Sequence, residues 1–117
     1  MTAHSETRPT TSAIQATLAE AAALGGTRAD LSELAAIGAE LRRHIAALLP
    51  AAEAHVEGLW RGGQEWYGRR SRLDNVQRHV TEQMTSSPLS AQVYVAILLR
   101  DCTWLLEHYG NPPREGR

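Results

Sequence analysis

The side chains best suited to metal chemistry are five histidines set among many carboxylates. His44 follows Glu40 by four positions, so both would share one face of a helix. Metal centres in helical bundles usually take a Glu-x-x-His pair from each of two helices. Glu40/His44 has one residue too many, and His79/Glu82 runs in reverse order. We therefore predict surface or half-buried histidines that hydrogen-bond to neighbours, with no metal site and no cofactor.

Cys102, the only cysteine, offers little support for nucleophilic chemistry. It lies in an apolar stretch beside Asp101, whose negative charge disfavours a thiolate. A buried structural thiol is the expected outcome. The sequence also has no nucleophile elbow, phosphate loop or dinucleotide fingerprint. It therefore predicts no catalytic residues and a protein that is not an enzyme.

The most distinctive segment runs from Trp60 to Arg72 and mixes aromatic with arginine side chains. The candidate interaction residues in it are Trp60, Arg61, Trp66, Tyr67, Arg69, Arg70 and Arg72. Trp, Tyr and Arg are enriched in the hot spots of protein interfaces, and the same mixture can bind phosphates and stack on bases. A third interpretation packs the tryptophans in the core and leaves the arginines solvated or paired with Glu65 and Asp74.

Aromatic side chains could also line a small-molecule pocket, because bundles place ligand sites between helices. The four candidates for such a pocket are Trp60, Trp66, Tyr94 and Trp104.

Asp101, Trp104 and His108 fall along one face of the last apolar segment. If Asp101 is buried it needs a partner, since an unpaired buried charge is costly. We predict a structural salt bridge to an arginine of the preceding helix, either Arg72 or Arg78.

The longest periodic segment positions many of these residues and crosses Pro50. Apolar residues recur every three or four positions from Leu31 to Leu59, as a helix face requires. Asp30 and Glu33 have the spacing of a capping box at its start. Proline usually kinks or ends a helix, yet the apolar stripe keeps its phase on both sides of Pro50. We predict one long helix kinked near Pro50, with two abutting helices as the alternative.

Three further helices are predicted around it. The first begins with a capping box at Ser12 and Gln15 and ends at Gly25-Gly26. Another runs from about Gln64 to Thr85, with a face of Trp66, Leu73, Val76, Val80 and Met84. The last runs from about Pro88 to Tyr109, with Ser87 as N-cap. Because it is apolar on most of its circumference, it should be the central element.

Together these segments predict an all-α protein, an antiparallel four-helix bundle in a single domain spanning residues 12–110. Residues 1–11 are expected to be a disordered lead and residues 111–117 a tail. The number of apolar positions is also sufficient for a dimer interface.

Composition and apolar runs limit the classes of partner and the cellular locations that we expect for the protein. The formal net charge is -1, which makes nucleic acid an unlikely partner. The N-terminus lacks the apolar core of a signal peptide. The longest apolar run, Val93–Leu99, is too short to span a bilayer. We expect a cytoplasmic protein with no membrane segment. All twelve basic residues are arginine, and phenylalanine is absent, a bias typical of a GC-rich genome.

Several segments resemble a family of small actinobacterial proteins that is abundant in streptomycetes. They are Leu41–Ile45, Leu48–Pro50, Glu65–Tyr67, Arg72–Asp74 and Leu99–Leu106, within about residues 30 to 110. Members have no established activity and carry the genome label "natural product biosynthesis protein". The resemblance implies a cytosolic accessory role, does not imply an enzyme, and transfers no catalytic residue.

The leading hypothesis is a non-enzymatic helical accessory or interaction protein, with a protein partner or a homodimer, linked to natural product biosynthesis or its regulation. The alternatives are a bundle that binds a small molecule and a nucleic-acid-associated regulator that uses Arg61, Arg69, Arg70 and Arg72.

Overall fold

A computed structural model of the protein describes residues 10–25, 29–82 and 87–110. They form four helices: α1 (Thr11–Gly25), α2 (Leu31–Glu57), α3 (Gln64–Thr81) and α4 (Pro88–Tyr109). The described residues contain no strand, so the all-α class is confirmed. Most of the predicted lead (residues 1–9), all of the predicted tail (111–117), Gly26 and Met84 lie outside the described residues.

Side chains that accept backbone N–H groups set the first two helix starts. The Asp30/Glu33 capping box is confirmed: Glu33 N–H donates to Asp30 Oδ1 at 2.8 Å, and Asp30 N–H donates to Glu33 Oε1 at 3.1 Å. The Ser12/Gln15 box is wrong. Ala13 N–H instead donates to Thr10 Oγ1 at 3.0 Å, because the helix already begins at Thr11.

The later helices have weaker N-caps. At the start of α4, Ser90 N–H donates to Ser87 Oγ at 3.4 Å and Pro88 takes the first helical position, as predicted. Helix α3 begins after Gly63 without a side-chain cap and ends at Thr81, earlier than the predicted Thr85.

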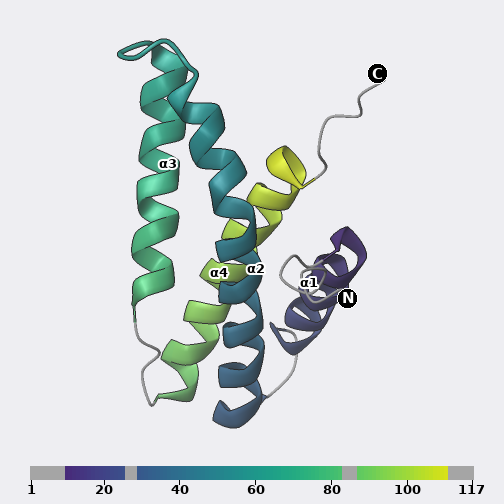
Figure 1. Ribbon diagram of the computed structural model, residues 1–117. Helices are drawn as coiled ribbons and strands as arrows, with labels where there is room; N and C mark the ends of the chain where they lie inside the picture. The colour runs from purple at the N-terminus through teal and green to yellow at the C-terminus, as the bar shows by residue number, and fades with distance from the viewer. Residues whose placement is uncertain (1–9, 26–28, 83–86, 111–117) are drawn as a thin grey trace.

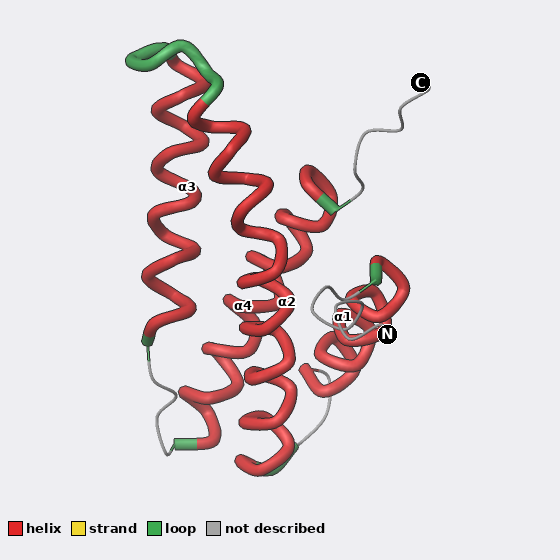
Figure 2. The backbone as a smooth tube through the Cα atoms, viewed as in Figure 1, coloured by secondary structure: helices red, strands yellow, loops and turns green. Residues whose placement is uncertain are grey.

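Helix α2 is one continuous helix that contains Pro50, which confirms the preferred prediction over two abutting helices. Pro50 has no N–H to donate to the carbonyl of Ala46. Both residues are exposed, so water can satisfy that carbonyl. The axis of α2 bends along its length in Figure 2. Its buried stripe ends at Val56, and Leu59 lies half-buried beyond the helix.

The helices form a flattened bundle in which consecutive helices run in opposite directions (Figure 1). Helices α2 and α4 share the most extensive contact, along the short diagonal of the bundle, while α1 and α3 lie on opposite flanks. Helices α1 and α3 do not touch each other in the described part of the chain. Helix α4 contacts the other three, as the prediction of a central element requires.

The core is built mainly from α2 and α4. Its largest fully buried apolar side chains include Leu34, Leu41, Ile45, Leu98 and Leu105. From α3, only Leu73 and Val76 are buried, and Trp66 and Val80 pack against the core from its edge. Helix α3 is thus attached by a narrow apolar strip.

Helix α4 is less completely covered than its apolar sequence predicts. Leu89 is 73% exposed and Val93 is 55% exposed, and both line an open groove between α1 and α4. By length and composition alone α4 could cross a membrane, but a core helix of a soluble protein meets the same criteria. The absence of a membrane segment stays a prediction.

His44 lies buried between α1 and α2, whereas a surface or half-buried position was expected. Its Nε2 is 2.9 Å from the hydroxyl of Thr17 on α1, and that hydroxyl also lies 3.2 Å from the carbonyl of Ala13. The pKa of His44 is lowered, chiefly by burial. Glu40 acts in the opposite direction, and Arg43 adds to the lowering. The neutral imidazole is therefore the form that the fold favours.

We predict that stability falls as the pH drops below 6.5, the ordinary pKa of His44. In that range the unfolded chain binds a proton at this imidazole that the folded protein binds only at lower pH. Urea unfolding at pH 7 and pH 5 should therefore show a larger loss of stability for the native protein than for His44→Gln. Equal losses in the two proteins would contradict a buried neutral His44.

Candidate functional site

The segment from Trp60 to Arg72 begins in a tight turn between α2 and α3. Gly63 N–H donates to the carbonyl of Trp60 at 3.0 Å. Gly62 has a φ of 88°, in the left-handed region that favours glycine. The turn lies at the projecting end of the α2–α3 hairpin (Figure 1). This hydrogen bond and the left-handed glycine define the backbone path of the turn.

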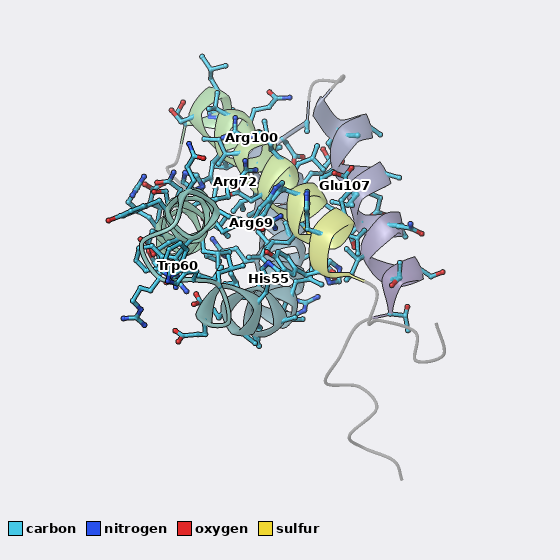
Figure 3. All side chains as sticks on the ribbon, turned by 90° about the horizontal axis from the view of Figure 1, so that it is seen from above. His55, Trp60, Arg69, Arg72, Arg100 and Glu107 are labelled. Atoms are coloured by element: carbon cyan, nitrogen blue, oxygen red, sulfur yellow. The ribbon has the colours of Figure 1, made fainter. Side chains whose placement is uncertain are left out.

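The turn and the first turn of α3 expose several large side chains. Trp60 is 86% exposed and Tyr67 is 60% exposed. Trp66 is half-buried and meets Tyr67 edge-on with ring centroids 5.0 Å apart, and the Arg61 guanidinium lies 5.9 Å from the Trp66 ring. We call Trp60, Arg61, Trp66 and Tyr67 the hairpin tip. Figure 3 shows Trp60 on the outer side of the hairpin, away from α4.

Arg70 points to α2 and has a structural role. Its NH1 and NH2 groups donate to the two carboxylate oxygens of Glu53, each at 3.1 Å, and its Nε donates to Asp74 at 3.3 Å. The hydrogen bond to Glu53 is the main cause of the raised pKa of Arg70. Gln77 also donates to Glu53, at 2.6 Å. The hydrogen bonds of Arg70 and Gln77 to Glu53 join α3 to α2.

Arg69 and Arg72 point instead toward α4 (Figure 3). They line a cleft of about 400 Å³ between the two helices, which we call the α3–α4 cleft. Its lining residues are Glu65, Gly68, Arg69 and Arg72 of α3, and Trp104 and His108 of α4. Steps of three, four and seven positions place the α3 members on one helix face. In Figure 1, α3 and α4 approach each other where α3 ends and diverge toward its start.

Both cleft arginines are held by aromatic rings. The Arg72 guanidinium lies 4.7 Å from the Trp104 ring centroid, a cation–π distance. Arg69 lies 5.9 Å from the rings of both Trp104 and Tyr109, and it donates to the Tyr109 hydroxyl at 2.7 Å. These contacts orient the two guanidinium groups without neutralising their charge.

Asp101, which is 1% exposed, lies below the cleft. The predicted partner Arg72 is near it, with 4.0 Å between NH2 and Oδ1. Arg78, the alternative, donates instead to Asn75 at 2.7 Å. The closest partner is His79, whose Nδ1 lies 2.6 Å from Asp101 Oδ2. Sequence analysis considered His79 only with Glu82 and missed it as the partner of Asp101, although it follows Arg72 by seven positions and so shares its helix face.

Cys102 is a buried thiol, as predicted. Burial, followed by the charge of Asp101, raises the pKa of Cys102 to about 12. The thiol is therefore protonated at neutral pH. Among the described residues, no group of three or more His, Cys, Asp or Glu side chains could hold a metal ion.

The predicted pocket of four aromatic residues does not form as one site. Tyr94 lies at the C-terminal end of α3, where its hydroxyl is 2.8 Å from the carbonyl of His79 and 3.0 Å from that of Glu82. Trp60 lies beyond the other end of α3 and is largely exposed. Helix α3 has 18 residues, so about 27 Å separates these ends. Of the four, only Trp104 lines the α3–α4 cleft.

The contrast between a half-buried and an exposed ion pair gives a stability prediction. Arg70→Gln should lower the free energy of unfolding by about 1.5–3 kcal/mol, because it removes charge-assisted hydrogen bonds to half-buried Glu53. The matched control is Arg43→Gln, which breaks only the exposed pair with Glu40 and should cost less than about 1 kcal/mol. Equal effects in urea unfolding would show that Arg70 is not structural.

Comparison with known proteins identifies one family. No curated protein and no solved structure matches the chain significantly. The model of the family of unknown function DUF6415 matches residues 12–114, which include all four helices, the hairpin tip and the α3–α4 cleft. The chain belongs to the family of unknown function DUF6415.

Proposed function

We propose that the protein is a non-enzymatic interaction protein that docks on a partner protein through the hairpin tip. The observation that carries this proposal is the 86% exposure of Trp60 on an ordered turn. Trp contributes strongly to interface hot spots when a partner removes it from water. Here the indole is available because the turn directs it away from the core.

The surroundings of Trp60 support the same proposal. Arg61 follows it in the turn, and exposed Tyr67 lies on the first turns of α3. Trp, Tyr and Arg are the three residue types most enriched in hot spots. The hydrogen bond between Gly63 and Trp60 and the left-handed Gly62 fix the backbone, so binding needs less ordering of the loop.

A nucleic-acid role for the same segment has less support. Its four arginines point in different directions: Arg61 lies at the tip, Arg70 pairs with Glu53, and Arg69 and Arg72 turn to α4. A surface that binds the phosphate backbone of a nucleic acid needs a continuous stripe of basic side chains that can neutralise several phosphates. These arginines do not provide one.

We further propose that this interaction is an accessory role in the cytoplasm, linked to natural product biosynthesis or its regulation. The support is the resemblance of segments such as Leu99–Leu106 to the streptomycete proteins that carry this label. The occupant of the tip is a different protein, or alternatively a second copy of this chain.

The test is a photo-crosslinking amino acid placed at position 61 of the full chain, next to the intact Trp60, and expressed in the source organism. Crosslinks from position 61 should concentrate on one protein. The control places the same probe at Glu107, an exposed position on α4 away from the tip (Figure 3). The same crosslinked proteins from both positions would show nonspecific contact and contradict a docking tip.

Once crosslinking has identified the partner, Trp60→Ala should weaken the affinity for it by roughly tenfold or more, which is the loss expected for a hot-spot residue. The stability of the protein alone should change by no more than about 0.5 kcal/mol, since the side chain packs little in the fold. Unchanged affinity of Trp60→Ala would refute the proposal. Crosslinks only to the same chain, with a dimer in light scattering, would identify a second copy as the occupant.

A further inference from the structure

We propose that the α3–α4 cleft is a binding site for a small organic monocarboxylate with a flat apolar body. The carboxylate binds Arg69 and Arg72, and the apolar body lies against Trp104. This site uses a different face of α3 from the hairpin tip and goes beyond the proposed docking function. Neither inference depends on the other.

The first observation is that the cleft arginines are incompletely paired. Arg69 NH2 lies 3.9 Å from Glu65, and Arg72 NH2 lies 4.0 Å from Asp101, both beyond hydrogen-bonding distance. Arg70, on the same helix, makes three hydrogen bonds to carboxylates. The two cleft guanidiniums therefore retain donors for a ligand. Their planar form suits a carboxylate, which can accept two parallel N–H groups.

The second observation is the preorganisation of these groups. The Arg72 guanidinium lies over the Trp104 ring, and Arg69 donates a hydrogen bond to the Tyr109 hydroxyl. Both side chains are only partly exposed, at 27% for Arg69 and 35% for Arg72. Long side chains that are already ordered lose less conformational entropy when a ligand binds. The cleft has a volume of about 400 Å³ and is open to solvent, so a bound ligand would be only partly enclosed.

The third observation is Gly68, which lines the cleft in the interior of α3. A Cβ atom added there would meet nothing within 4 Å. Packing therefore does not require glycine, although glycine costs about 1 kcal/mol relative to alanine inside a helix. What the missing side chain provides is open space beside Arg69 and Arg72, where a ligand can enter.

The charges at the cleft favour a singly charged anion over a doubly charged one, because Arg69 and Arg72 are opposed by Glu65 in the lining and by Asp101 beside Arg72. A phosphate monoester carries nearly two negative charges at pH 7 and would face Glu65 at the cleft and Asp101 beneath it.

The experiment titrates the full ¹⁵N-labelled chain with sodium 2-naphthoate at constant ionic strength. The readout is the NMR chemical shift of two N–H signals, the backbone amide of Gly68 and the indole N–H of Trp104. The indole signal is assigned by its loss in the variant Trp104→Phe. Saturable shifts at both groups are expected. The neutral isostere 2-naphthamide should give none, because it lacks the charge that the arginines recognise.

Two variants test the site and leave Arg72 in place, because Arg72 also pairs with buried Asp101. Arg69→Gln and Gly68→Gln should each weaken naphthoate binding by roughly tenfold or more, the first by removing a guanidinium and the second by filling the open space. Gln is a better helix former than Gly, so loss of fold would not explain the second result. Arg43→Gln, which removes an arginine from the surface of α2, should bind as the native chain does.

Three results would overturn the proposal. Shifts that fail to saturate or that lie away from the cleft would show that it is no binding site. Undiminished binding by Arg69→Gln and Gly68→Gln would place naphthoate elsewhere. Tighter binding of 2-naphthyl phosphate than of 2-naphthoate would assign the cleft to phosphate esters instead of carboxylates.

Discussion

The buried carboxylate of Asp101 is the constraint that shapes the contact between α3 and α4. Asp101 lies on the central helix α4 and needs a compensating partner, because an isolated charge is very costly in a protein interior. Helix α3 supplies His79 at 2.6 Å and Arg72 at 4.0 Å. Since α3 contributes only Leu73 and Val76 to the buried core, these polar contacts largely decide where it lies against α4.

Contacts between α3 and α4 form a series along both helices. Tyr94 meets the carbonyl groups at the end of α3, His79 meets Asp101, and Arg72 and Arg69 reach Trp104 and Tyr109 in turn. The helices diverge along this series (Figure 1). Arginine side chains span the wider part, where apolar packing is sparse. The α3–α4 cleft is the space that this divergence leaves.

Much of the fold could be predicted because it depends on local rules. The phase of the apolar stripe identified α2 as one helix despite Pro50, and the spacing of Asp30 and Glu33 identified its cap. The error at Ser12 has the same origin, since Thr10, two positions earlier, is also a residue type that caps helices. Local patterns did not show that Leu89 and Val93 would be exposed, because their exposure depends on where α1 and α3 pack.

The sequence predicted which segment carries the candidate sites, but not which way each of its side chains points. Sequence analysis identified the Trp60–Arg72 region, but consecutive residues of a helix point about 100° apart. Arg69 therefore faces α4 while Arg70 faces Glu53 on α2. Assigning each arginine required knowledge of which helices flank α3. The same limit hid His79, whose role appears only when Asp101 is placed opposite it.

The most direct test of this account is the coupling energy between Asp101 and His79. It is measured by urea unfolding of Asp101→Asn, His79→Gln and the double variant at pH 7. Residues that share one hydrogen-bonded pair should show a coupling of about 0.5–3 kcal/mol, so that the double variant is less destabilised than the sum of the single variants. Additive effects within about 0.3 kcal/mol would contradict the claim that the Asp101 pair shapes the contact between α3 and α4.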